Sequence, residues 1–131
     1  MGIKRVTVHC VDIEDKSGSL HRFLSQSGLS GIDFLCFIAV SAGNNRGRVF
    51  VSAKDPKQFE AFVQEAKIRT TPAAGFIIDG SDRVGAAADV IAALAKNDIP
   101  GVAGAAMVVD GRYQILIVVD AKNADRAQKL L

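Results

Sequence analysis

Apolar positions in the first half of the chain follow strand-like and helix-like periods in alternation. Runs rich in β-branched and aromatic residues predict buried strands. Apolar residues three and four apart predict helices with one buried face. In chain order the expected elements are a strand at 6–11, a helix at 19–27 ending near Gly28, strands at 32–40 and 48–54, a helix opened by Asp55-Pro56, and a short strand at 67–71.

The same order of elements begins again in the second half. Asp110-Gly111 between two apolar runs predicts a hairpin, because a type I′ turn needs positive φ at both central positions. Asp82 is an N-cap residue type, so we expect it to cap a helix with Val90, Ile91 and Leu94 facing inward. The expected elements are a strand at 75–78, the helix after Asp82, strands on both sides of Asp110-Gly111 (the first starting at Ile99), and a helix from Asp120 to Leu131.

Residue spacing indicates a true repeat. Gly18 and Gly85 are 67 positions apart (85 − 18 = 67), and the same offset relates many matching residues of the two halves. After the hairpins the offset falls to 65, as from Asp55 to Asp120 (120 − 55 = 65). The sequence therefore predicts an α+β chain of two ferredoxin-like βαββαβ modules in tandem, each an antiparallel sheet with its helices on one face.

The repeat also sets the module boundaries. We expect module 1 at 1–71 and module 2 at 72–131, and module 2 lacks its final strand. Either another chain fills that edge, or the edge stays open, or the strand lies outside this sequence. An unpaired edge is a template for strand pairing with a second copy, so we expect a homodimer.

Composition narrows the class of protein. Of 131 residues, 49% are hydrophobic and 23% are charged, which is typical of a globular chain with a substantial core. The net charge of +2 gives no strong field for nucleic acid or membrane, and no apolar run reaches the ~18–20 residues of a membrane span. Cys10 and Cys36 lie in apolar runs, and we interpret them as buried free thiols of a cytoplasmic protein; a disulfide or a metal pair is the alternative.

A polar turn follows the first strand and leads into the first helix. A strand that bends into a helix through a glycine leaves backbone N–H groups free at the positive end of the helix dipole, where a carboxylate can bind. Asp15 or Asp33 could meet the ammonium group of an amino acid. The alternative is that Asp15 and Ser17 only cap the helix.

The same turn occurs again around Gly85. With these two turns, the chain resembles a tandem pair of ACT domains, the small amino-acid-sensing modules of metabolic regulation. The acidic-to-glycine turn, Leu20 and the Gly31-Ile32-Asp33 segment carry the resemblance. It implies a non-catalytic regulatory protein that binds an amino acid or a similar metabolite at module or subunit interfaces, without a cofactor or metal, and acts on a metabolic enzyme. The implied ligand-binding residues are Asp15, Lys16, Ser17, Gly18, Ser19, Leu20, Asp33, Phe34, Leu35, Asp82, Arg83, Val84, Gly85 and Ala86, with residues near Pro100 to Ala103 as equivalents of the second strand.

Three other functions compete with sensing. An acylphosphatase-like enzyme would use Arg83 in the turn, but the later strand offers Gln114 in place of an Asn, and no catalytic residue set is visible. RNA binding through the sheet would need exposed aromatic residues such as Phe50 and Tyr113. The last alternative is an interaction or oligomerisation module with a degenerate ligand site, which the absence of Pro before Gly18 and Gly85 favours.

Overall fold

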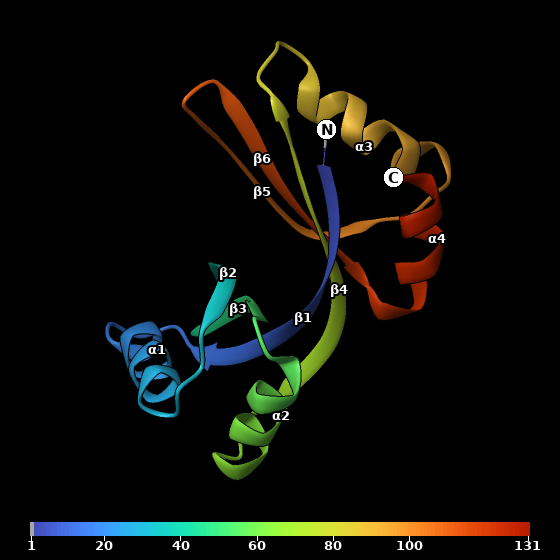
Figure 1. Cartoon of the computed structure of the whole chain (residues 1–131). Coiled ribbons are helices and arrows are strands. Elements are labelled where there is room, and N and C mark those ends of the chain that lie inside the picture. Colours follow the sequence, from blue (N-terminus) through green and yellow to red (C-terminus); the bar gives the residue numbers. More distant parts are fainter. Residues whose placement is uncertain (1) are drawn as a thin grey trace. The chain divides into compact units, whose positions relative to one another are not determined.

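The computed structural model describes residues 2–131. Within them it is an α+β structure with six strands and four α-helices (Figure 1). The elements are β1 (Gly2–Glu14), α1 (Ser19–Leu29), β2 (Phe34–Gly43), β3 (Arg46–Ala53), α2 (Pro56–Glu65), β4 (Thr70–Ser81), α3 (Ala86–Lys96), β5 (Gly101–Val109), β6 (Arg112–Asp120), a 3-10 turn (Ala121–Asn123) and α4 (Ala124–Leu130). The expected order of elements and its repetition are therefore present.

The chain forms two compact units, the first of which comprises residues 7–72. Its strands lie in the order β2-β3-β1-β4, and β3 pairs antiparallel with both β1 and β2. Alternate residues of β1 and β3 pack against α1 and α2, so both helices cover the same sheet face. The buried residues of this core are Val11, Phe23, Ile32, Val49, Val51, Ala53, Phe59 and Val63.

The second unit combines residues 2–6 with residues 73–131. Its strands lie in the order β1-β4-β6-β5, and β6 pairs antiparallel with both β4 and β5. Alternate residues of β4 and β6 pack against α3 and α4. The largest members of this core are Phe76, Ile78, Leu94, Ile99, Tyr113, Ile115, Ile117 and Val119.

The N-terminal residues occupy the place where module 2 lacks a strand. The Gly2 amide donates to Asp79 Oδ1 at 3.1 Å, and Arg112 donates to Asp79 Oδ2 at 2.8 Å. The Arg112 hydrogen bond lowers the pKa of Asp79, so this carboxylate stays charged. None of the three expected alternatives for that edge included this same-chain strand. The physical reason is length: β1 has 13 residues, more than twice the usual five or six, and reaches beyond one small sheet.

Turn chemistry confirms several expected boundaries. Asp55 caps α2, because its Oδ1 accepts from the Gln58 amide at 3.2 Å, and Pro56 is the first helical residue. Asp110 and Gly111 have φ of 50° and 74°, as a type I′ hairpin requires. These signals are local, so the sequence alone was enough to place them.

Three expectations were wrong. Gly28 lies inside α1, and Gly31 takes the left-handed position after the helix with φ 78°. Residues 67–69 are not strand, and β4 runs through Pro72 without a break. Pro72 lies before the β4–β6 ladder, which starts at Ala73, so the proline removes no donor from that ladder. Ile91 is 46% exposed and does not face the core.

Core burial predicts a sharp difference between two leucines on helices. Leu94 in α3 is 2% exposed and Leu29 at the end of α1 is 89% exposed. We expect Leu94→Ala to lower the free energy of unfolding by about 2–5 kcal/mol, since it removes buried methyl groups and leaves a cavity. The matched Leu29→Ala should change it by less than about 0.5 kcal/mol. Urea unfolding followed by circular dichroism measures both, and similar losses would contradict the assigned core.

Candidate functional site

The first strand-to-helix turn has a left-handed glycine as the N-cap of α1. Gly18 has φ 91°, a conformation that L side chains rarely adopt. The Ser19 amide donates to the Lys16 carbonyl at 3.1 Å. Among residues 2–131 the amides of Gly18, Leu20 and His21 find no hydrogen-bond acceptor. The helix start therefore presents free donors as expected, although Ser19 is not one of them.

The second turn repeats this hydrogen-bond pattern. Gly85 is the N-cap of α3 with φ 85°, and the Ala86 amide donates to the Arg83 carbonyl at 3.2 Å. The Asp89 amide donates to the Gly85 carbonyl at 3.1 Å, as the Arg22 amide does to the Gly18 carbonyl at 2.8 Å. The repeat seen in the sequence is thus a repeat of backbone geometry.

Helix capping by the acidic and hydroxyl residues of the turns was a wrong expectation. Neither α1 nor α3 has a side-chain hydrogen bond at its N-cap. Asp15 instead accepts from Ser41 Oγ at 2.6 Å, and its amide donates to the Asn45 carbonyl at 2.8 Å. The Asp82 amide likewise donates to the Gly111 carbonyl at 2.9 Å. Both acidic residues fasten the turn to the neighbouring hairpin, Asp15 through its carboxylate and its amide and Asp82 through its amide.

Space beside the two glycines is open. A Cβ atom built on Gly18 or on Gly85 would meet no heavy atom within 4 Å. Lys16 and Ser17 are exposed, and Val84 is fully exposed. Leu20 packs against the core of its unit, and Ala86 is buried in its own. The groups exposed at each turn are therefore backbone amides and the side chains before the glycine.

The expected site residues at the start of β2 lie far from the Gly18 turn within unit 7–72. Phe34 is level with Ala53 across the β2–β3 ladder, whereas Glu14 is level with Arg46. Seven residues of β3 separate these levels (53 − 46 = 7), which is roughly 20 Å. Asp33 is paired with Lys54 at 2.7 Å, and Leu35 is 39% exposed. One unit alone does not bring the two expected halves of the site together.

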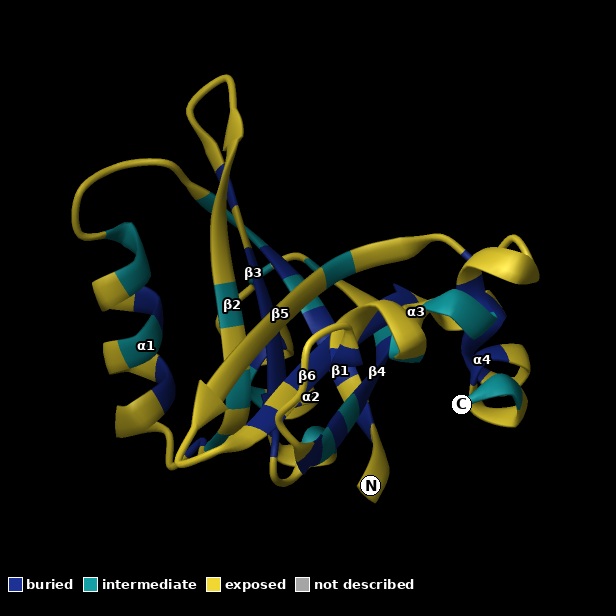
Figure 2. Cartoon of the chain, turned by 90° about the horizontal axis from the view of Figure 1, so that it is seen from above, coloured by how far each residue is buried: buried dark blue, intermediate teal, exposed yellow. Residues whose placement is uncertain are grey.

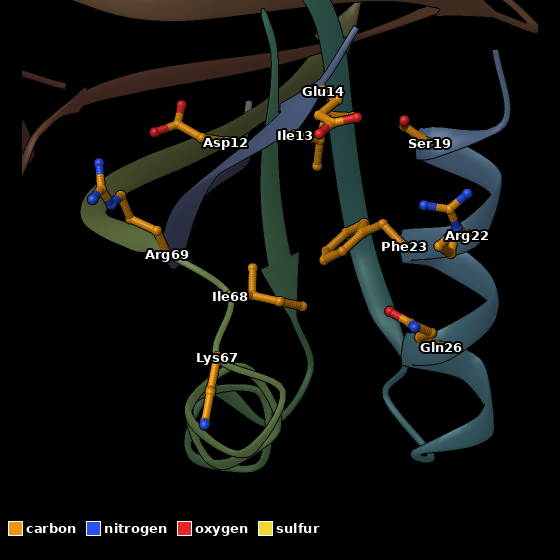
Figure 3. Close-up of a pocket in the computed structure, with 10 residues that line it drawn as sticks. All are labelled: Asp12, Ile13, Glu14, Ser19, Arg22, Phe23, Gln26, Lys67, Ile68 and Arg69. Atoms are coloured by element: carbon orange, nitrogen blue, oxygen red, sulfur yellow. The ribbon is translucent and has the colours of Figure 1, made fainter. Parts of the chain in front are cut away.

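A groove beside the first turn was not predicted (Figure 3). It has a volume of about 330 Å³ and lies between α1, the end of β1 and the segment before β4. No local pattern in the sequence indicates the groove, because its lining residues come from three separate stretches and the apolar pattern at 67–71 predicts a strand. Its lining residues are Asp12, Ile13, Glu14, Ser19, Arg22, Phe23, Gln26, Lys67, Ile68 and Arg69. The hydrogen bond from Lys16 lowers the pKa of Glu14, so its carboxylate remains charged at the rim.

Burial and ion pairing argue against RNA binding and against acylphosphatase chemistry. Phe50 is 4% exposed and Tyr113 is 8% exposed, so neither can stack on a base. The Arg83 guanidinium is bound by Asp89, which occupies the group that an acyl phosphate would need. Cys10 and Cys36 are half-buried free thiols, and burial raises the pKa of both. In the described chain no three potential metal ligands converge, and no helix combines the length and apolarity of a membrane span.

His9 has a structural place in the core. Its ring is 4% exposed and lies 5.1 Å from the ring of Phe59. Nε2 lies 3.3 Å from Glu60 Oε1, and Nδ1 has no partner in the described residues. His9 is therefore a core residue. His21, in contrast, is exposed on α1.

Capping gives a direct test of the turn geometry. We expect Ser17→Ala to change the free energy of unfolding by less than about 0.5 kcal/mol, because Ser17 makes no cap. Asp55→Ala should lower it by about 1 kcal/mol, since it removes an N-cap acceptor. Thermal unfolding of both variants measures the difference. A loss for Ser17→Ala as large as that for Asp55→Ala would restore the capping interpretation.

Comparison with known proteins relates this geometry to a fold. No protein-family model and no curated protein matches the sequence. A solved protein from Bacteroides thetaiotaomicron matches with a TM-score of 0.76 at 13% identity, covering 97% of this chain and 88% of that one. The ligand-free regulatory subunit of aspartate kinase from Thermus thermophilus matches with a TM-score of 0.66 at 16% identity, covering 98% and 92%. Aspartate kinase from Clostridium acetobutylicum matches with a TM-score of 0.64 at 17% identity, covering 98% of this chain and 33% of that one. The chain thus shares its fold with these regulatory subunits of aspartate kinase.

Proposed function

We propose that this protein is a non-catalytic regulatory module that binds an amino acid at its strand-to-helix turns. In this proposal each compact unit is one ferredoxin-like ACT module, and the binding sites are completed at a module or subunit interface. The regulated partner is a metabolic enzyme, and the setting is the cytoplasm. Similarity of fold to regulatory subunits of aspartate kinase supports a regulatory role, while the ligand chemistry is argued from the turns.

One observation carries the proposal: α1 and α3 each start at an uncapped left-handed glycine beside open space. A helix N-terminus favours a negative group through its free N–H donors and its dipole. The amides of Gly18, Leu20 and His21 suit the carboxylate of an amino acid. The glycine has no side chain to keep that carboxylate away from the backbone.

The ammonium group needs acceptors from elsewhere. Asp15 lies beside the turn, and its carboxylate already accepts from Ser41. Asp33, Phe34 and Leu35 of the same unit are at the other end of the strands, so residues of this kind must come from a neighbouring module or a second copy. The proposed site is therefore an interface site, and binding would stabilise that interface by linkage.

Exposed apolar edges favour oligomerisation as a second candidate function. β2 and β5 are the outermost strands of their units and are largely exposed (Figure 2). Phe37 is 46% exposed, and Met107, Val108 and Val109 are 55–62% exposed. Edge strands with unpaired backbone groups and apolar side chains favour pairing with another chain.

Amino-acid binding is tested by thermal shift with each of the twenty amino acids. We expect at least one of them to raise the melting temperature, because a ligand at a hundred times its Kd stabilises the folded state by about 2.7 kcal/mol. Gly18→Ala and Gly85→Ala should each reduce this shift at one site. Gly43→Ala is the matched control, since Gly43 has φ 77° in a hairpin with open space around it. Flat curves for all twenty would contradict the proposal.

Edge pairing is tested by sedimentation velocity. We expect a dimer that Phe37→Lys or Val108→Lys shifts toward monomer, because each places a charge on an exposed strand edge. Leu29→Lys adds the same charge to an exposed helix position and should leave the dimer intact. A wild-type protein that stays monomeric at high concentration would rule out this candidate.

A further inference from the structure

The unit formed by residues 2–6 and 73–131 contains a hollow on the helix side of its sheet. The hollow has a volume of about 240 Å³ and lies between α3, the end of α4 and the first residues of β1. An apolar cavity of roughly 150 Å³ is enough to hold a benzene ring, so this hollow is large enough for a small aromatic molecule. Its main apolar lining residues are Ile3, Ile78, Val90, Ala93, Leu130 and Leu131.

The two charged side chains of the lining neutralise each other. Arg83 is bound by the Asp89 carboxylate, and the two side chains are 58% and 65% exposed. Because both are largely exposed, this ion pair lies at the rim of the hollow. A charged ligand would leave water without finding an unpaired charge among the lining side chains, so the hollow favours an uncharged molecule.

One polar atom of the lining has no partner. Tyr113 is 8% exposed, and its hydroxyl forms no hydrogen bond with any residue from 2 to 131. A hydroxyl that is removed from water without a partner is unfavourable. A ligand atom that accepted a hydrogen bond from it would recover that loss.

A glycine in the neighbouring strand makes room for this phenol. A Cβ atom built on Gly80 would lie 2.5 Å from the Tyr113 hydroxyl oxygen and 2.6 Å from its Cζ. No larger residue than glycine therefore fits under the ring at this position of β4. The hydroxyl is thus held against the sheet on the side that carries α3.

The other unit has an aliphatic residue in the corresponding cross-strand pair. Gly80 of β4 is opposite Tyr113 of β6, whereas Ile13 of β1 is opposite Gly47 of β3. The offset of 67 relates Ile13 to Gly80 (80 − 13 = 67), so the glycine and the large residue have exchanged strands. The isoleucine side chain has no polar atom. The fold that the two units share therefore does not require a hydroxyl at this place.

We propose that this hollow is a second ligand site, which binds a small uncharged molecule with an apolar ring and one carbonyl oxygen. The ring lies against Ile3, Val90 and Leu130, and the carbonyl oxygen accepts a hydrogen bond from the Tyr113 hydroxyl. The site is separate from the open space at the Gly85 turn, since Gly85 does not line the hollow. Its uncharged ligand also differs from the amino acid proposed for the turns.

The test uses three probes and backbone-amide NMR of the full chain. Acetophenone is the complete probe, ethylbenzene lacks the carbonyl oxygen, and benzoate carries a charge. We expect millimolar acetophenone to shift the amides of Ile3, Val90 and Tyr113. Ethylbenzene should bind about three- to tenfold more weakly because it forgoes one hydrogen bond, and benzoate at least about tenfold more weakly because its charge must leave water.

Three results would overturn the proposal. The first is that acetophenone shifts none of these amides. The second is that benzoate binds as tightly as acetophenone. The third is that the shifts are confined to the exposed strands β2 and β5, since this would show non-specific contact with apolar surface.

Variants separate the hydrogen bond from the packing of the ring. Tyr113→Phe keeps the ring and removes the hydroxyl, so it should weaken acetophenone binding by about three- to tenfold and leave ethylbenzene binding unchanged. Ala93→Leu should abolish the binding of both probes, because it fills the hollow. Ala95→Leu adds the same bulk at an exposed position of α3 and should leave both affinities unchanged. Unchanged acetophenone binding in Tyr113→Phe or in Ala93→Leu would contradict the assignment.

Discussion

The structure depends on two long strands that each contribute to both compact units. β1 supplies residues 2–6 to one unit and residues 7–14 to the other, and β4 is divided in the same way after Pro72. Without residues 2–6, the unit formed by 73–131 would leave one side of β4 unpaired, and unpaired strand edges favour aggregation. The two repeats are therefore adjacent in sequence but are not independent segments of chain.

A left-handed glycine at the start of a helix is the second constraint on the structure. With Gly18 and Gly85 as N-caps, no side chain satisfies the first amides of α1 or α3. The acidic residues before them are bonded to hairpins in place of the helix. In ordinary helix starts such residues serve as caps, whereas here the Asp15 carboxylate binds Ser41 and neither helix has a side-chain cap.

The two units have kept the same backbone and have diverged in side chains. Arg22 and Asp89 occupy matched positions with opposite charges, and Asp89 pairs with Arg83 of its own unit. The cores differ in the same way: Phe59 lies in an aromatic cluster, whereas its counterpart Ala124 is a small residue under a shorter helix. The two units therefore share an order of elements and a turn geometry but differ in their side chains.

Local signals in the sequence determined the helices, the hairpins and the repeat. Asp55-Pro56 and Asp110-Gly111 act through the conformation of two or three neighbouring residues, so no distant contact is needed to interpret them. The partners of Asp15 and Asp82, the groove beside α1 and the strand supplied by residues 2–6 were decided only by the tertiary structure. Each of these joins residues that are distant in the chain, and no local pattern specifies which distant group a side chain or a strand edge will meet. The sequence by itself thus determined what the elements are, and the packing decided which of their polar groups remain available for function.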